Sequence, residues 1–530
     1  MMKMPPIQKK YIYLILFISL LYYLPGVISP RDFWVEDEAR YGEILREMIH
    51  DGRWFVTYLN GTFYSDKPPI YFWLCALASV LLGKITVFSC MIVTWLSTVG
   101  CLLVTYKFSA ELEDARSGFL SAMILLSTFL FIACAQIVRM DMLMTLFIIW
   151  ALYLFYLGHH KKQRKYYTLF YVLTGLAVLS KGPFGFTFPF IPPLIFLAVR
   201  REWKEMRHFV FHWGFLIFLT MIGAWLGGAW LTGHRDFVHS LFLEQMAGRA
   251  VQSFAHKEPW YFYIMLLPGV MLPWFAFLFR AVYHDKRADK PYSLLLYAWF
   301  VAGIVSISVI SGKLFIYLLP VMPPAAMVLG PFFNRLLNDK SLRNRWFALE
   351  SVSMTVLLFG LFAATPFVAR QFPTTHMANL WPLAWVFIPV TVLGIVLGTA
   401  KKVRAFLIMT IAALWLFGLY GFLVIAPQTN PIVSARTIGL ELAGLAEKGY
   451  TVSTHDVRRG IFNFYADMLL PGLESGELTD YMQNPRHILV TKKKTYEKFK
   501  NQWPPDITIL SCREIANEFY VVTGRRQETP

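Results

Sequence analysis

The chain has 530 residues, of which 56% are hydrophobic and 16% are charged, with a formal net charge of +17. Soluble domains carry about 25% charged residues, so this composition excludes an ordinary soluble protein and indicates a polytopic membrane protein. The five cysteines show no paired spacing, which excludes a disulfide framework and a cysteine-rich zinc site. The cations cluster in short loops between apolar runs, so the basic excess indicates membrane topology and not nucleic-acid binding.

The N-terminal lysines precede an apolar run that lacks a clear small-residue cleavage site, so we predict a retained signal-anchor helix. Thirteen runs approach the roughly 20 apolar residues that a spanning helix needs. They are 11–29, 86–106, 118–134, 142–157, 166–180, 183–199, 209–231, 260–280, 293–310, 314–332, 346–367, 380–399 and 404–425. A fourteenth run, 69–82, is short and begins next to Lys67-Pro68-Pro69.

Charge decides whether the run 69–82 crosses the membrane. If it does not cross and the N-terminus is cytoplasmic, all the basic loops are cytoplasmic, as the positive-inside rule requires. These loops are Lys161 to Lys165, Arg200 to Arg207, Lys286 to Lys290, Arg335 to Arg345, and Lys401 to Arg404. We therefore expect 69–82 to dip into the bilayer or lie along its surface. Four parts then share the extracytoplasmic side: the acidic first loop (about 30–85), the turn with Arg139 and Asp141, the loop from His234 to Pro259, and the tail from about 427.

The tail differs in composition from the rest of the chain. Segments beginning at Tyr450, Ile488, Ile507 and Phe519 have the β-branched and aromatic content of strands, and Arg436 to Lys448 and Lys493 to Asn501 read as helices. We predict a transmembrane domain over 1–426 and a small extracytoplasmic α/β domain over 427–530. No catalytic motif is visible in this tail, and its lysine-rich stretch is typical of a solvated face.

The first loop is dense in charged residues, whereas the rest of the chain contains few. Asp37 to His50 reads as a helix with Tyr41, Ile44, Leu45 and Met48 on one face. Such a helix is expected to rest its apolar face on the bilayer and to hold its acids toward water. A structural interpretation, an acidic first turn that complements the helix dipole, accounts for Glu36 or Glu38. It does not account for Asp37 and Asp66 together with Lys67, so we predict that Asp37 is catalytic.

Asp141 lies at the expected edge of the membrane, directly after Arg139-Met140. A helix N-cap or a topological Arg–Asp anchor are alternatives. Ionisable groups at the end of an apolar helix are costly unless they are partnered, which favours a functional role.

Lys67, Lys181 and Lys313 are single lysines in apolar surroundings, on the side that the positive-inside rule disfavours. An anionic ligand such as a lipid-linked phosphate would explain them, because lysine binds phosphate well as a point charge. Snorkelling of the side chains is the alternative. Arg249 and His256 add polar groups to the same side. A carboxylate there could act as general base on an acceptor hydroxyl while cations stabilise a departing phosphate.

These residues resemble those of bacterial polyprenyl-phosphate-dependent glycosyltransferases of the protein O-mannosyltransferase superfamily, in particular the aminoarabinose transferases that modify lipid A. The resemblance covers most of residues 10–330. In the first loop it rests on Glu36-Asp37-Glu38-Ala39-Arg40-Tyr41-Gly42-Glu43-Ile44-Leu45-Arg46-Glu47-Met48, Asp51-Gly52-Arg53-Trp54, Asn60-Gly61 and Tyr64-Ser65-Asp66-Lys67-Pro68. Later it rests on Ser180-Lys181-Gly182, Glu244 with Arg249, His256-Lys257-Glu258-Pro259-Trp260-Tyr261, Leu272-Pro273-Trp274, Gly312-Lys313-Leu314 and Tyr317-Leu318-Leu319-Pro320.

The resemblance implies a GT-C architecture of about thirteen spans with a periplasmic C-terminal domain, and a sugar donor carried on undecaprenyl phosphate. By position, Asp37 matches the first-loop catalytic acid, Asp141 the second acid, and Lys67 the lysine near the donor phosphate. Arg40, Asp66, Lys181, Arg249, His256 and Lys313 are further candidates for binding the donor phosphate or the substrate. Asp66 stands where the aminoarabinose enzymes usually have Glu, and Gln245 where His is common, which puts the sugar and acceptor in question.

We therefore predict a multi-pass transferase of the bacterial inner membrane, with a cytoplasmic N-terminus and a periplasmic C-terminus. The first hypothesis is transfer of 4-amino-4-deoxy-L-arabinose from undecaprenyl phosphate to lipid A; transfer of another sugar to a protein or glycan is the alternative. No metal is required, although clustered acids could bind a divalent ion. A transporter or flippase is a rival from another class, but transporters place ionisable residues near the bilayer midplane. A membrane receptor that binds through its tail is a further rival.

Overall fold

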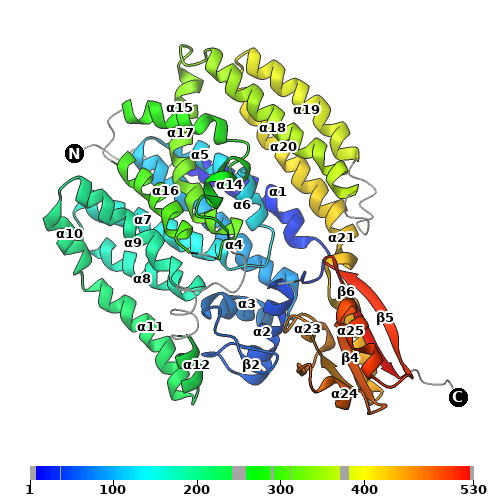
Figure 1. Cartoon of the computed structure of the whole chain (residues 1–530). Helices are drawn as coiled ribbons and strands as arrows, with labels where there is room; N and C mark the ends of the chain where they lie inside the picture. The colour runs from blue at the N-terminus through cyan, green and yellow to red at the C-terminus, as the bar shows by residue number, and fades with distance from the viewer. Residues whose placement is uncertain are drawn as a thin grey trace.

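The computed structural model describes residues 8–35, 37–241, 258–287, 292–310, 312–370 and 381–525. Figure 1 shows a large helical body with a smaller α/β unit attached at one end, beside helices α2 and α3. The helices of the first half are α1 (Lys9–Ile28), α2 (Asp37–Asp51), α3 (Ile70–Leu81), α4 (Val87–Leu112), α5 (Ala115–Leu126), α6 (Phe129–Cys134), α7 (Asp141–Lys161), α8 (Lys165–Lys181), α9 (Phe184–Val199), α10 (Trp203–Val210), α11 (Gly214–Leu231) and α12 (Arg235–Ser240).

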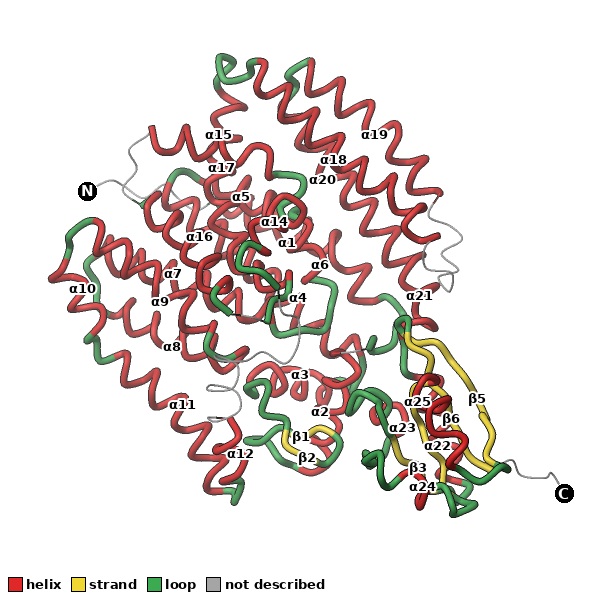
Figure 2. Tube along the Cα trace, viewed as in Figure 1, coloured by secondary structure: helices red, strands yellow, loops and turns green. Residues whose placement is uncertain are grey.

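The second half of the helical body continues the same pattern of apolar helices joined by short loops. Its helices are α14 (Phe262–Val270), α15 (Phe275–Arg287), α16 (Ser293–Ser308), the 3₁₀ helix η2 (Phe315–Val321), α17 (Met322–Asn338), α18 (Arg345–Arg370), α19 (Trp381–Thr399), α20 (Val403–Tyr420), η3 (Gly421–Ile425) and α21 (Ala426–Val433). Figure 2 shows α18, α19 and α20 running side by side at one flank.

Several of the predicted spans are single helices of full length, and others are interrupted. Within the described residues, seven helices are long and apolar enough to cross a membrane, or eight if the bent pair α14 and α15 is one span. The expected run 118–134 is divided into α5 and α6 at Ser127 and Thr128, whose hydroxyls bond back to carbonyls of the preceding turn. The run 260–280 bends by 100° between α14 and α15. The count of thirteen spans stays a prediction.

The short run 69–82 forms α3, which has 12 residues. At 1.5 Å per residue this helix is about 18 Å long, so it is too short to cross a hydrocarbon core of about 30 Å. The helix packs on α2 and α4. Its length agrees with the prediction that this segment does not cross.

The C-terminal unit contains every element that the sequence predicts for it. Its strands β3 (Thr451–Thr454), β4 (His487–Lys492), β5 (Ile507–Ile515) and β6 (Glu518–Arg525) form one sheet in the order β3-β4-β6-β5. Strands β3 and β4 are parallel, and the other neighbours are antiparallel. The helices are α22 (Arg436–Glu447), α23 (Asn463–Ala466), α24 (Leu478–Tyr481), α25 (Lys493–Phe499) and the short η4 (Lys500–Gln502).

The C-terminal unit is docked on the first loop through polar contacts. Asn60, in the turn between β1 (Tyr58–Leu59) and β2 (Thr62–Phe63), accepts from the backbone N–H of Leu470 at 2.8 Å and donates to its carbonyl at 2.6 Å. The side chain of Asp32 accepts hydrogen bonds from Asn430 and Ser434 at 3.0 and 2.8 Å. These bonds join the tail to the segments on both sides of α2.

Candidate functional site

The start of α2 is fixed to the turn before α7 by the carboxylate of Glu38. Its oxygens accept from the backbone N–H of Trp34 at 3.1 Å and of Val138 at 2.7 Å, and they pair with Arg31. Glu38 is 6% exposed. Because Val138 lies in the segment that leads to α7, this one buried carboxylate brings the first residue of α2, Asp37, next to the first residue of α7.

Asp37 and Asp141 meet at Arg139. The Nη1 of Arg139 bonds Asp37 Oδ2, and its Nε lies 3.2 Å from Asp141 Oδ2. The ammonium of Lys181, at the end of α8, bonds the other oxygen of Asp141. The structure therefore brings together two acids and one lysine that the sequence singled out, and it adds Arg139 as the group between them.

The two carboxylates differ in accessibility. The side chain of Asp37 is 27% exposed, whereas that of Asp141 is 2% exposed. A group that touches a substrate has to be reachable from outside, so the geometry favours Asp37 as the reacting group. Asp141 is placed to hold Arg139 and Lys181 by charge.

Asp141 does not cap its helix, so the N-cap alternative is wrong. The N-cap of α7 is Met140, and no side-chain capping bond is present there. The carboxylate is committed to Arg139 and Lys181, because a buried charge needs partners of the opposite sign.

Arg40 is placed on the same side of α2 as Asp37. Its Nη1 lies 3.6 Å from Asp37 Oδ1, and its guanidinium stacks over the ring of Tyr64 at 5.2 Å. The Nε of Arg40 is buried without a hydrogen-bond partner within the described residues. Tyr64 leads directly to Asp66 and Lys67, which are both half-buried before the start of α3. Arg40 therefore connects the predicted catalytic acid to the predicted phosphate-binding loop.

The C-terminal unit adds Arg459, a residue that the sequence reasoning missed. Its guanidinium bonds Thr62 Oγ1 and donates to the carbonyl of Phe63 at 3.2 Å, two residues of strand β2. Burial and then the charge of Arg40 lower the pKa of Arg459, and the charge of Asp66 opposes this shift. Arg459 therefore lies within electrostatic reach of the Asp66–Lys67 loop. No local motif marked it, because its neighbours in the sequence carry no catalytic signature.

The ammonium groups of Lys181 and Lys313 both have partners within the protein. Lys181 is paired with Asp141 and lies 4.5 Å from the ring centroid of Tyr317. The ammonium of Lys313 donates to the carbonyls of Glu258 and Ile310 at 2.9 and 2.6 Å. Snorkelling toward water is wrong for both, since they are 8% and 4% exposed. The predicted site residues Arg249 and His256, with Glu36 and Gln245, lie outside the described residues.

The environment of α2 differs from the expected one. Its apolar residues Tyr41, Ile44 and Leu45 are fully covered by the protein's own side chains, so the helix does not rest that face on lipid. Its acids are also not all held toward water. Glu43 is fully buried against Arg46, and Glu47 is 4% exposed and accepts the backbone N–H of Gly61 at 3.0 Å. Helix α2 is therefore a largely internal element whose acids fix the loop. Asp37 at its start is partly exposed, and His50 and Asp51 at its end are exposed.

Metal chemistry gains no support from the described side chains. No three His, Cys, Asp or Glu groups gather there as a metal site would require. The acids at the site are instead compensated by Arg139, Arg40 and Lys181. A divalent ion stays a prediction.

The geometry is that of a helical membrane body with a charged site at one end, covered in part by an α/β unit. Residues 66–227 match the sequence family of dolichyl-phosphate-mannose-protein mannosyltransferases. The structure resembles ArnT from Cupriavidus metallidurans, solved bound to undecaprenyl phosphate, with a TM-score of 0.79 and 19% identity over 98% of this chain and 100% of that one. These matches define a glycosyltransferase of the GT-C class.

Relatives in sequence identify the family within this class. The chain is 30% identical over 377 residues to the undecaprenyl phosphate-α-4-amino-4-deoxy-L-arabinose arabinosyl transferase of Shewanella sediminis, covering 67% of both chains. The same-named protein of Yersinia enterocolitica is 29% identical, with 66% of this chain and 63% of that one covered. An uncharacterized protein of Aquifex aeolicus is 25% identical over 87% of this chain and 88% of its own. The chain belongs to the family of undecaprenyl phosphate-aminoarabinose arabinosyl transferases.

Proposed function

We propose that this chain transfers 4-amino-4-deoxy-L-arabinose from undecaprenyl phosphate to lipid A at the periplasmic surface of the inner membrane. Family membership supports the donor and the sugar. The observation that carries the proposal is the partly exposed Asp37 held between Arg139 and Arg40 at the end of the helical body. A carboxylate flanked by cations suits a reaction in which an acceptor attacks while phosphate leaves.

In the proposed reaction, the bond between the sugar anomeric carbon and the donor phosphate oxygen breaks, and the phosphate keeps the electron pair. A new bond forms between that carbon and an acceptor oxygen. Asp37 orients this oxygen and takes its proton if it carries one. Arg40 and Lys67 stabilise the undecaprenyl phosphate that leaves, and Asp141 acts indirectly by positioning Arg139. Arg249 and His256 are kept as candidates for binding the donor, whereas the ammonium of Lys313 is engaged by the carbonyls of Glu258 and Ile310.

The topology follows from the same arrangement. We propose that residues 1–426 form the transmembrane domain, with a cytoplasmic N-terminus, and that residues 427–530 form a periplasmic domain. The contact of the first loop with the tail through Asn60 and Arg459 supports placing both on one side. Labelling of single engineered cysteines at exposed positions 51 and 474 with a membrane-impermeant reagent tests this. Reaction at only one of the two in intact spheroplasts would rule it out.

Mass spectrometry of lipid A tests the reaction. Cells that lack their own aminoarabinose transferase but make the donor are compared with and without the chain. We expect lipid A to gain the mass of one or two aminoarabinose residues when the chain is present. Unmodified lipid A, despite detectable chain in the membrane, would reject this acceptor and sugar.

The second candidate is transfer of another sugar to a protein, which the match to the protein mannosyltransferase family supports. The departure at Asp66, where the aminoarabinose enzymes usually have Glu, leaves the sugar open to test. Glycoproteomics of the periplasm in the same strains separates the two: a chain-dependent glycan on protein with unchanged lipid A favours this candidate.

A further inference from the structure

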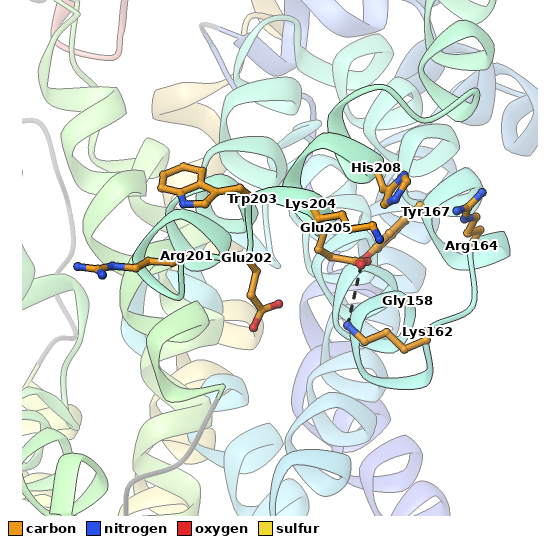
Figure 3. Close-up of a pocket in the computed structure, with 10 residues that line it drawn as sticks. All are labelled: Gly158, Lys162, Arg164, Tyr167, Arg201, Glu202, Trp203, Lys204, Glu205 and His208. Carbon is orange, nitrogen blue, oxygen red and sulfur yellow. Dashed lines mark hydrogen bonds and ion pairs between the residues drawn. The ribbon is translucent and has the colours of Figure 1, made fainter.

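A second charged site lies at the end of the helical body away from Asp37. A cavity of about 610 Å³ opens between the α7–α8 turn and helix α10. An adjoining cavity of about 630 Å³ shares three of its residues, Arg164, Lys204 and His208. Figure 3 shows these three side chains on one side of the adjoining cavity, with Arg201 and Trp203 directed to the other side. We call the first cavity the cationic pocket; its lining is Arg164, Lys204, Arg207, His208, Phe211, His212 and Trp213.

The position of the pocket follows from the length of α7. This helix begins at Asp141 in the candidate active site and ends at Lys161, beside the pocket, after 21 residues. At 1.5 Å per residue the two sites are about 30 Å apart, which is the thickness of a bilayer's hydrocarbon core. Helix α11 also leads from the pocket to α12, whose Phe237 lies 5.9 Å from Phe63 of the first loop. The pocket is therefore at the level of the opposite membrane surface.

The charge of the pocket is not compensated by its own lining. The lining contains three cations and no acid. Within the described part of the chain, Arg164, Lys204 and Arg207 form no ion pair with a carboxylate. The acids of the adjoining cavity have other partners: Glu205 accepts from Tyr167 at 2.6 Å and lies 3.9 Å from Lys162, and Glu202 pairs with Arg200 at 2.6 Å. A concave group of unpaired cations is suited to an anion.

His212 supplies an independent indication of a hydrogen-bond acceptor. Its Nδ1 accepts from the backbone N–H of Gly214 at 3.1 Å, so its Nε2 carries the proton in the neutral ring. That Nε2 is buried without a partner among the described residues, and the side chain is 7% exposed. A buried donor without an acceptor is costly, so an acceptor that enters the pocket would be stabilised.

The aromatic residues at the rim indicate what carries the anion. Phe211 and Trp213 are 81% and 58% exposed, and Trp203, at the start of α10, is 57% exposed. Aromatic side chains at this level of a membrane protein favour the interface between headgroups and acyl chains. A soluble phosphate would leave these apolar surfaces in water, whereas a lipid would cover them.

We propose that the cationic pocket binds the phosphate headgroup of an anionic phospholipid in the leaflet opposite the candidate active site. Arg164, Lys204 and Arg207 neutralise the phosphate, and His212 Nε2 donates to one of its oxygens. Phe211 and Trp213 contact the glycerol and the upper acyl chains. This inference does not rest on the proposed function, because the pocket and Asp37 lie on opposite surfaces.

The test measures lipid binding by the purified full-length chain in a neutral detergent, by native mass spectrometry during titration with phosphatidylglycerol. Phosphatidylcholine is the neutral lipid control, and inorganic phosphate is the free-anion control. The variant Arg164→Gln/Lys204→Gln removes two exposed cations of the pocket. The matched variant Lys401→Gln/Lys402→Gln removes two exposed cations from another loop that the sequence predicts on the same side.

We expect a phosphatidylglycerol-bound species that phosphatidylcholine does not reproduce. Because each cation near an anionic lipid surface contributes about a fivefold change in binding, the pocket variant should bind at least tenfold more weakly. The matched variant should stay within about twofold of the original chain. Equal weakening by both variants would overturn the proposal in favour of diffuse attraction. Equal binding of both lipids, or displacement of phosphatidylglycerol by inorganic phosphate at the same concentration, would also overturn it.

A variant at His212 checks the hydrogen bond separately. His212→Phe keeps an aromatic ring and removes both the Nε2 donor and the Nδ1 acceptor of the Gly214 N–H. We expect weaker phosphatidylglycerol binding. Unchanged binding in this variant would contradict the role of His212. If His212→Phe lowers the melting temperature, the titration is repeated with Arg207→Gln, which alters only an exposed side chain of the pocket.

Discussion

Asp37 and Asp141 are bridged by one guanidinium, that of Arg139, and only Asp37 reaches the outside of the protein. The bridge gives the two acids unequal tasks. The exposed one can meet a substrate, and the buried one, held by Lys181, fixes the guanidinium. Because Asp141 holds the Arg139 guanidinium in place, this guanidinium need not move when a substrate binds. Fewer charged groups then have to reorganise during the reaction.

Asp37→Asn should therefore abolish most transfer while leaving the fold intact. A positioned acid–base group contributes about 10²-fold to 10⁴-fold to a rate, so we expect a loss in this range in membranes supplied with the purified lipid donor. Asp51→Asn, at the other end of α2, is the matched control and should retain activity. Near-normal turnover by Asp37→Asn would remove this residue from the reaction.

The buried pair of Lys181 and Asp141 should show strong coupling. Removing one partner leaves an uncompensated buried charge, which typically costs about 3–5 kcal/mol. Lys181→Met should therefore lower the melting temperature clearly. The double variant Lys181→Met/Asp141→Asn should regain much of that stability yet stay inactive, because Arg139 has lost its anchor. Additive losses in a double-mutant cycle would show that the two groups do not interact.

Arg459→Gln should weaken catalysis without unfolding the chain. Among the described residues, this exposed side chain bonds Thr62 and Phe63 of the first loop, and it lies within electrostatic reach of Asp66. We expect kcat/KM to fall about fivefold to tenfold, mainly through KM, as for the loss of one charge near a bound anion. Arg513→Gln, on strand β5, is the matched control and should change neither constant. Equal kcat/KM for Arg459→Gln and the original chain would show that this residue of the tail does not contribute to catalysis.

The contrast between Asp37 and Arg459 shows what the sequence can reveal. Asp37 stands in a dense acidic motif at the start of an amphipathic segment, so its helix could be predicted; its side of the membrane stays a prediction. The tail's strands could also be predicted from their β-branched and aromatic content. Arg459 could not be found, because its role arises from docking of the tail on Thr62, a contact between segments far apart in the chain. The same limit applies to Lys181, whose partner Asp141 is set by the packing of α7 on α8.

The hydrogen bonds of the Asn60 side chain should stabilise the docking of the tail on the first loop. Asn60 has φ +54° and makes hydrogen bonds to the backbone of Leu470 and the side chain of Asn463. Asn60→Gly keeps a backbone that tolerates positive φ and removes only the side chain. We expect about 1–3 kcal/mol less stability of the docked tail, seen as faster limited proteolysis within 430–525. Asn484→Gly, in the same tail but away from the contact with Asn60, is the control. Equal cleavage rates for the two variants would contradict this role.

Stability should also depend on pH through Glu43. Burial raises the pKa of Glu43 to about 7, against the opposing hydrogen bonds and charge of Arg46. The folded chain therefore binds more protons than the unfolded chain between about pH 4.5 and 7, so stability falls as pH rises through this window. The contribution is at most about 3 kcal/mol, because each pKa unit corresponds to about 1.4 kcal/mol. Melting temperatures at pH 5 and 8 should differ less for Glu43→Gln, which cannot titrate, than for the original chain. Glu474→Gln, an exposed acid, should keep the original difference; parallel pH profiles for the original chain and Glu43→Gln would assign the effect to another group.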